Sequence, residues 1–136
     1  LHADWLTDKA YNVTTDLINS GTEFNYIFAN NDMMAQGCYN ALKDAGKENI
    51  PIVSTGGSPD GFKMLQDGIE AANMTAPVSI QGVKTFMNLY NKVALGEDPA
   101  EKFTALPVIP VSADDTSSYI AWDDYAAAYK YLGENK

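Results

Sequence analysis

Few side chains in this chain could act as nucleophiles, general bases or metal ligands. The 136 residues include one histidine, His2, and one cysteine, Cys38. A Ser-His-Asp or Cys-His arrangement needs a histidine held firmly beside its partners, and His2 lies at the end of the chain. A zinc site needs three or four nitrogen or sulfur ligands, which these two residues do not supply. The sequence therefore predicts no catalytic residue, no metal site and no cofactor, with Cys38 as a small core residue.

The remaining candidate chemistry is hydrogen bonding to a ligand at the ends of apolar strands. Tyr26 to Asp32 reads YIFANND, and the apolar run Ile50 to Thr55 leads into the loop GGSPDG. The carboxyl ends of parallel strands meet at one edge of a sheet, where ligands of open α/β proteins bind. Gly56 and Gly57 in that loop could form a plain tight turn, or a turn whose exposed amides meet a ligand.

Asn31 has two possible roles at the same edge. As the N-cap of the following helix, its side chain would accept a hydrogen bond from a backbone amide. As a ligand contact, it would point across the crevice. Asp32 could cap the helix instead and leave Asn31 free, so the residues alone leave both roles open.

Helical and extended patterns alternate along the chain, which predicts an α/β fold with a mainly parallel sheet and helices on both faces. Residues 1–136 are expected to form a single domain, because no linker or repeat interrupts them. The expected helices are Thr7–Ser20, Asp32–Ala45, Ser58–Gly68, Val78–Leu95 and Asp123–Leu132, and the expected strands are Phe24–Ala29, Ile50–Thr55 and Ala71–Thr75.

Three local features sharpen this prediction. Thr7 and Ser58 are expected to cap their helices. The segment Phe103–Val111 contains two prolines, so it is expected at a sheet edge or between domains. In the longest helix Phe86, Met87 and Tyr90 share one face and are expected in the core.

Composition limits the partners. Nine basic and eighteen acidic residues give a net charge of −9, and all nine basic residues are lysines. Without arginine and with this acidic balance, the sequence predicts no nucleic-acid partner, since phosphate contacts dominate nucleic-acid binding. No apolar run approaches the roughly 18 residues that span a bilayer. Because the chain begins at Leu1, we expect a processed chain or an excised piece.

The segment from YIFANND through GGSPDG resembles the C-terminal lobe of sugar-binding proteins of ABC transporters, of the ribose and glucose/galactose type. ADW at Ala3 to Trp5, AANMTA and PVIPVSADD extend the resemblance over nearly the whole chain. The resemblance implies one lobe of a two-lobe fold, incomplete at its N-terminal side and without the N-terminal lobe. It also implies a ligand held between two lobes that close on it.

The resemblance further implies which residues bind the ligand. Trp5 matches an aromatic position that stacks on a sugar ring, and Asn31 matches a polar position that hydrogen-bonds sugar hydroxyls. Gly56 stands where the family has an aspartate, and Ala76 where it has a glutamine or asparagine. With Gly57, these small residues are expected to leave space for a ligand that is bulkier or less hydroxylated than ribose or glucose.

The expected function is therefore that of a non-enzymatic solute-binding component of an ABC importer. It would capture a small ligand, a monosaccharide or a derivative, and deliver it to a membrane permease, with no nucleic-acid partner. The expected location is extracytoplasmic, either periplasmic or lipid-anchored, behind a signal peptide. The alternative is the ligand-sensing domain of a LacI-type transcription regulator, which has the same fold. An upstream signal peptide or a helix-turn-helix would separate the two.

Overall fold

The fold is an open four-stranded sheet with helices packed against it, as described for residues 1–99 and 101–134 of a computed structural model. Its helices are α1 (Thr7–Asn19), α2 (Asp32–Asp44), α3 (Pro59–Gln66), α4 (Val78–Tyr90), which continues into the π-helical turn η1 (Asn91–Leu95), and α5 (Tyr125–Glu134). Its strands are β1 (Ile27–Ala29), β2 (Ile52–Gly56), β3 (Glu70–Thr75) and β4 (Ile109–Ser112). None of the helices described is long and apolar enough to cross a membrane.

The sheet has the order β1-β2-β3-β4. β1 pairs with β2 and β2 with β3 in parallel, whereas β4 runs antiparallel to β3. The predicted α/β class with a mainly parallel sheet is confirmed. β4 contains Pro110 and lies at the sheet edge, which confirms the prediction drawn from the prolines of this segment.

The two parallel connections place their helices on one face of the sheet. Both β1-α2-β2 and β2-α3-β3 step in the same direction across the strand order, and crossovers are right-handed. Ile52, Ser54 and Asn73 are buried on the covered face, while Phe28 and Met74 are 55% and 37% exposed on the other. Within the described residues, the helices expected on both faces thus pack on one.

Two apolar clusters form the core. The first joins α1, α2, β1 and β2 and includes Cys38, which is buried and accepts a hydrogen bond from the hydroxyl of Thr14 at 3.3 Å. Burial raises the pKa of the Cys38 thiol. The second joins α3, α4, β4 and α5 around Leu65 and Ile80. The prediction of Cys38 as a small core residue is confirmed.

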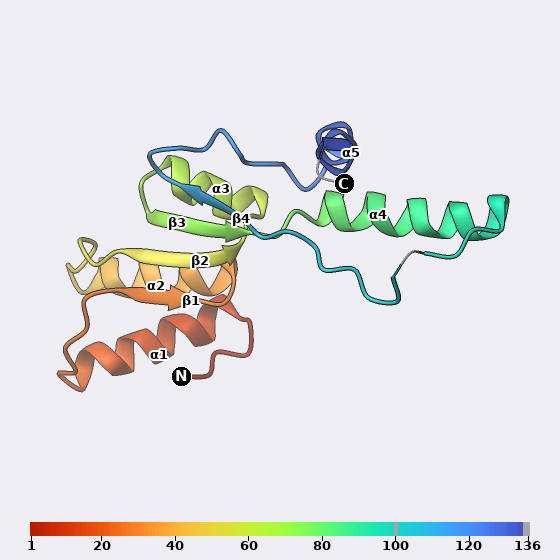
Figure 1. Ribbon diagram of the computed structural model, residues 1–136. Helices are drawn as coiled ribbons and strands as arrows, with labels where there is room; N and C mark the ends of the chain where they lie inside the picture. Colours follow the sequence, from red (N-terminus) through yellow and green to blue (C-terminus); the bar gives the residue numbers. More distant parts are fainter. Residues whose placement is uncertain (100, 135–136) are drawn as a thin grey trace.

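The outer part of α4 corrects one expectation. Phe86 is 67% exposed and Tyr90 is 52% exposed, so the prediction that they lie in the core is wrong for these two residues. Met87 is half-buried. Figure 1 shows the physical reason: α4 runs away from the sheet, and only its first turns lie beside α5. An apolar helical face predicts burial only where the described chain supplies a covering element.

Two predicted helix caps have different outcomes. The hydroxyl of Ser58 accepts a hydrogen bond from the amide of Gly61 at 3.1 Å, and Pro59 is the first residue of α3, as predicted. Thr7 is instead the first helical residue of α1, whose N-cap is Leu6 without a side-chain hydrogen bond. The Thr7 prediction is wrong by one position.

Candidate functional site

The ends of the three parallel strands meet at one edge of the sheet, which we call the carboxyl edge. The Thr55 hydroxyl donates to the Asn30 carbonyl at 3.0 Å and ties the end of β2 to the end of β1. The Ala76 amide donates to the Gly56 carbonyl at 3.0 Å and ties the segment after β3 to β2. The predicted placement of these strand ends at a common edge is confirmed. Ala76 is exposed there.

Asn31 at this edge caps α2. Its side-chain oxygen accepts a hydrogen bond from the Met34 amide at 2.7 Å, so Asn31 is the N-cap, while its contact with a ligand stays a prediction. Its Nδ2 lies 3.4 Å from the Trp5 carbonyl. Because an amide nitrogen carries two hydrogens, Asn31 retains one donor for a further contact. Asp32 does not cap α2.

Trp5 lies beside Asn31 on the segment that precedes α1. Its side chain is 61% exposed, and its backbone φ of 65° is in the left-handed region. A left-handed conformation is uncommon for a large residue and marks a tightly turned backbone. A cavity of about 310 Å³ lies against this segment and is lined by Trp5, Asn30, Met34 and residues 1–4. Trp5 therefore presents an accessible aromatic surface at the carboxyl edge.

The polar groups of the Gly56-Gly57 turn form hydrogen bonds within the fold. The amides of Gly57 and Ser58 point at the Asp32 carboxylate, at 3.4 and 2.7 Å, and Asp32 thereby neutralises the N-terminal end of α3. The Gly57 carbonyl accepts from the Tyr119 hydroxyl at 3.1 Å. The alternative of exposed turn amides is thus excluded for Gly57 and Ser58.

The space expected beside these glycines is also filled. A Cβ on Gly56 would lie 2.8 Å from Asp32 Oδ2, and a Cβ on Gly57 would lie 2.6 Å from the Thr75 Cβ. Both glycines have a positive backbone φ, 131° and 72°, which residues with a side chain rarely adopt. The expectation that they open room for a bulkier ligand is therefore wrong: close internal packing and backbone conformation explain these glycines. Their contact with a ligand stays a prediction.

A group of buried polar side chains lies directly beneath the carboxyl edge, and we call Asp32, Ser54, Glu70 and Asn73 the polar cluster. Asn73 Nδ2 lies 2.7 Å from Asp32 Oδ1, 2.8 Å from Ser54 Oγ and 3.0 Å from Glu70 Oε2. Ser54 Oγ lies 3.2 Å from Asp32 Oδ1 and 2.9 Å from Glu70 Oε1. The cluster joins α2, β2 and β3 under the turn.

Sequence reasoning missed this cluster. Burial raises the pKa of Glu70 to about 7; hydrogen bonds from Asn73 and Ser54 act in the opposite direction, and the charge of Asp32 raises it further. The only local signal was the presence of two polar residues, Glu70 and Asn73, in a short strand, and their burial is evident only in the fold. Tyr119 and Trp122, which hydrogen-bond the turn carbonyls, were missed as well.

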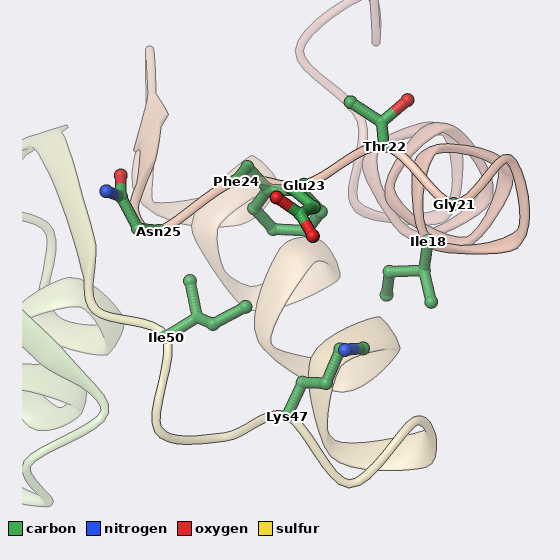
Figure 2. Close-up of a pocket in the computed structure, with 8 residues that line it drawn as sticks. All are labelled: Ile18, Gly21, Thr22, Glu23, Phe24, Asn25, Lys47 and Ile50. Atoms are coloured by element: carbon green, nitrogen blue, oxygen red, sulfur yellow. The ribbon is translucent and has the colours of Figure 1, made fainter.

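A larger cavity lies at the opposite end of the strands, the amino edge. Figure 2 shows its lining, which comes from the end of α1, the loop before β1 and the loop before β2. It measures about 610 Å³ and is lined by Ile18, Gly21, Thr22, Glu23, Phe24, Asn25, Lys47 and Ile50. No residue predicted to bind ligand lies there.

Comparison with known proteins places this geometry in a family. Residues 1–98 match a family model described as a periplasmic binding protein domain. The chain belongs to the periplasmic-binding-protein family. Members similar to it are binding proteins rather than enzymes, including the ribose import binding protein of Salmonella typhimurium, 35% identical over 101 residues. That match covers 74% of this chain and 34% of the relative, so the chain spans about a third of the relative's length.

Solved structures of the family have the same fold. A periplasmic solute-binding protein of an ABC transporter from Actinobacillus succinogenes, with bound D-allose, aligns with a TM-score of 0.76 at 24% identity. That alignment covers 86% of this chain and 41% of the other. A solute-binding protein from Bacillus halodurans, with bound myo-inositol, aligns with a TM-score of 0.73 at 21% identity over 97% of this chain and 41% of the other. These likenesses establish the lobe architecture.

Proposed function

We propose that this chain is part of a sugar-binding protein of an ABC importer and that the carboxyl edge supplies one side of the ligand site. The observation that carries the proposal is the position of Trp5, exposed beside Asn31 and against a cavity at the edge where the strands end. Ligands of open α/β sheets bind at this edge. Membership of the periplasmic-binding-protein family supports the same reading.

The two side chains suit a sugar for different reasons. The exposed ring of Trp5 can pack on the C–H face of a sugar ring, and the free Nδ2 hydrogen of Asn31 can be donated to a hydroxyl oxygen. The relatives support this class, since one is named for ribose import and one solved structure holds D-allose. The exposed Ala76 adds no polar side chain to this site, whereas His2, Asp4 and Asn30 line the cavity beside Trp5 and carry polar groups that could meet further hydroxyls.

Delivery to a permease and an extracytoplasmic location are parts of the same proposal. They rest on the family, whose members similar to this chain include a ribose import protein, and not on a feature of the fold itself. The test is detection of the full-length protein outside the cytoplasmic membrane in fractionated cells. Recovery in the cytoplasm, bound to DNA, would favour the transcription regulator instead.

Ligand binding is tested by calorimetry of the full-length protein with ribose, allose and myo-inositol, and with leucine as a non-sugar control. We expect binding of at least one of the three polyols and no heat with leucine. For the ligand that the parent protein binds, Trp5→Ala should weaken the binding free energy by roughly 1–3 kcal/mol, the scale of a buried aromatic contact.

A matched control separates stacking from general loss of aromatic surface. Tyr26 is 66% exposed at the amino end of β1, so Tyr26→Ala should leave the affinity unchanged. Equal affinity of the Trp5→Ala variant and the parent protein would show that Trp5 is not the stacking surface.

A further inference from the structure

Ser54 and Asn73 lie between two buried carboxyl groups, those of Asp32 and Glu70. Together they carry too few hydrogens to satisfy both groups when both are ionised. Ser54 carries one hydroxyl hydrogen and Asn73 carries two amide hydrogens. Each of the two residues lies within 3.2 Å of both Asp32 and Glu70, and the Asn73 amide also lies 2.8 Å from Ser54 Oγ. With both carboxyl groups ionised, the single Ser54 hydrogen could serve Asp32 or Glu70 but not both.

One proton on Glu70 resolves this shortage. Donated from Oε1 to Ser54 Oγ at 2.9 Å, it frees the Ser54 hydrogen for Asp32, while Asn73 gives one hydrogen to each carboxyl group. It also removes one of two like charges from a site where all four side chains are buried. Geometry and charge therefore favour the same protonated arrangement.

The proton belongs on Glu70 rather than on Asp32. Asp32 accepts hydrogen bonds from the backbone amides of Ser58 and Gly57 in addition to those from the cluster. Burial raises the pKa of Glu70 to about 7, which agrees with this assignment.

The surrounding elements bring few charged groups toward Glu70. From α2, the charge of Asp32 acts on Glu70, and the β2 neighbours Ser54 and Ile52 are uncharged. On α3, Asp60 is exposed, and Lys63 is exposed and pairs with Asp67 at 2.8 Å. Among the described residues, no cationic side chain forms a hydrogen bond or an ion pair with the Glu70 carboxyl group.

We propose that Glu70 is a positioning residue whose proton, relayed through Ser54, holds the Asp32 carboxylate against the amides of Gly57 and Ser58 and so fixes the turn at the carboxyl edge. Loss of the proton leaves a second negative charge in the cluster and withdraws a hydrogen from Asp32. The start of α3 is then held less firmly. The effect on ligand affinity, unlike the effect on the turn, rests on the proposed sugar-binding function.

The direction of the pH dependence follows from the folded and unfolded pKa values. Glu70 has a pKa of about 7 in the fold against its ordinary value of 4.5, so the folded protein binds more protons between these two pH values. The free energy of unfolding therefore falls as the pH rises through this range, and the contribution of the proton is lost above about pH 7.

The first test follows nuclear magnetic resonance signals of the unaltered full-length protein between pH 4 and pH 9, a range that brackets the two pKa values. The side-chain carboxyl carbon of Glu70 and the backbone amides of Gly57 and Ser58 should shift together, with one midpoint near neutral pH. A Glu70 midpoint near its ordinary value would overturn the assignment of the proton. Titration of Glu70 near neutral pH without movement of the two amides would overturn the positioning role.

The second test uses Glu70→Gln, a neutral residue of the same shape whose amide can donate to Ser54. We expect the Gly57 and Ser58 amides of this variant to keep their low-pH positions throughout, with no titration near neutral pH. Glu48→Gln removes the same charge from an exposed site, so the Gly57 and Ser58 amides of this control variant should shift with pH as they do in the parent protein. A Glu70→Gln variant that still shows the neutral midpoint at the two amides would contradict the proposal.

Ligand affinity provides the last arm. For the sugar that the full-length protein binds, affinity should weaken several-fold from pH 6 to pH 8 in the parent and stay constant in Glu70→Gln. Constant affinity in the parent between these two pH values would show that the protonation of Glu70 does not affect ligand binding. If none of the three polyols binds, the proposed function fails, while the amide titrations still decide the role of Glu70.

Discussion

The two ends of the sheet differ in how they are built. At the carboxyl edge, side-chain and backbone hydrogen bonds tie β1 to β2 and β2 to the segment after β3, over the polar cluster. At the amino edge, two loops and the end of α1 enclose a cavity about twice as large, 610 against 310 Å³. The hydrogen bonds around the larger cavity are mostly between backbone groups or exposed side chains, such as that from the Ile27 amide to the Pro51 carbonyl, and among the described residues no buried cluster of polar side chains lies beneath it. The proposed ligand site therefore rests on the position of the carboxyl edge at the strand ends and on its polar groups, and not on the size of its cavity.

The largest expected difference between the two ends comes from Asp32. Asp32→Ala leaves the amides of Gly57 and Ser58, and the side chains of Ser54 and Asn73, without their shared acceptor. We expect a loss of about 3 kcal/mol in the free energy of unfolding, the scale for buried polar groups left without partners. Chemical unfolding of the full-length protein measures it.

Lys47, which lines the amino-edge cavity and is exposed, provides the comparison. Lys47→Ala should change the free energy of unfolding by less than about 0.5 kcal/mol, as surface substitutions usually do. Similar losses in the Asp32 and Lys47 variants would break the distinction between the two edges.

Two glycines with the same backbone conformation sharpen the distinction. Gly57 and Gly21 both have a φ of 72°, but a Cβ at Gly57 would meet Thr75 at 2.6 Å and one at Gly21 would meet nothing within 4 Å. Gly21→Ala should therefore cost only the left-handed backbone conformation, about 1 kcal/mol. Gly57→Ala adds a clash in the buried turn and should cost at least about 2 kcal/mol in thermal or chemical unfolding. Equal costs would mean that the carboxyl edge repacks as freely as the amino edge.

Much of the carboxyl edge could be predicted from local sequence signals. Asn31 and Ser58 are small polar residues directly before helical patterns, and both cap their helices. The polar cluster could not be predicted in this way, because Asn73 and Asp32 are 41 positions apart and meet only in the folded sheet. Phe86 shows the opposite error, since its helical position is local information and its burial depends on a covering element.

The smallest expected difference concerns single exposed hydroxyls at the two ends. Thr55→Val removes the hydrogen bond to the Asn30 carbonyl and should lower the free energy of unfolding by about 1 kcal/mol. Thr22→Val, on the rim of the amino-edge cavity, removes a hydroxyl contact to Ser20 between exposed side chains and should have an effect near zero. A larger loss of unfolding free energy for Thr22→Val than for Thr55→Val would contradict stronger hydrogen bonding at the carboxyl edge.

The most direct test of ligand binding at the carboxyl edge is a map of chemical-shift changes in the full-length protein as a bound sugar is titrated in. We predict that the largest changes fall on the indole of Trp5, the side-chain amide of Asn31 and the backbone amide of Ala76. Signals of Thr22, Asn25 and Lys47 around the amino-edge cavity should stay in place. Changes concentrated at the amino edge, with Trp5 and Asn31 unmoved, would contradict the account.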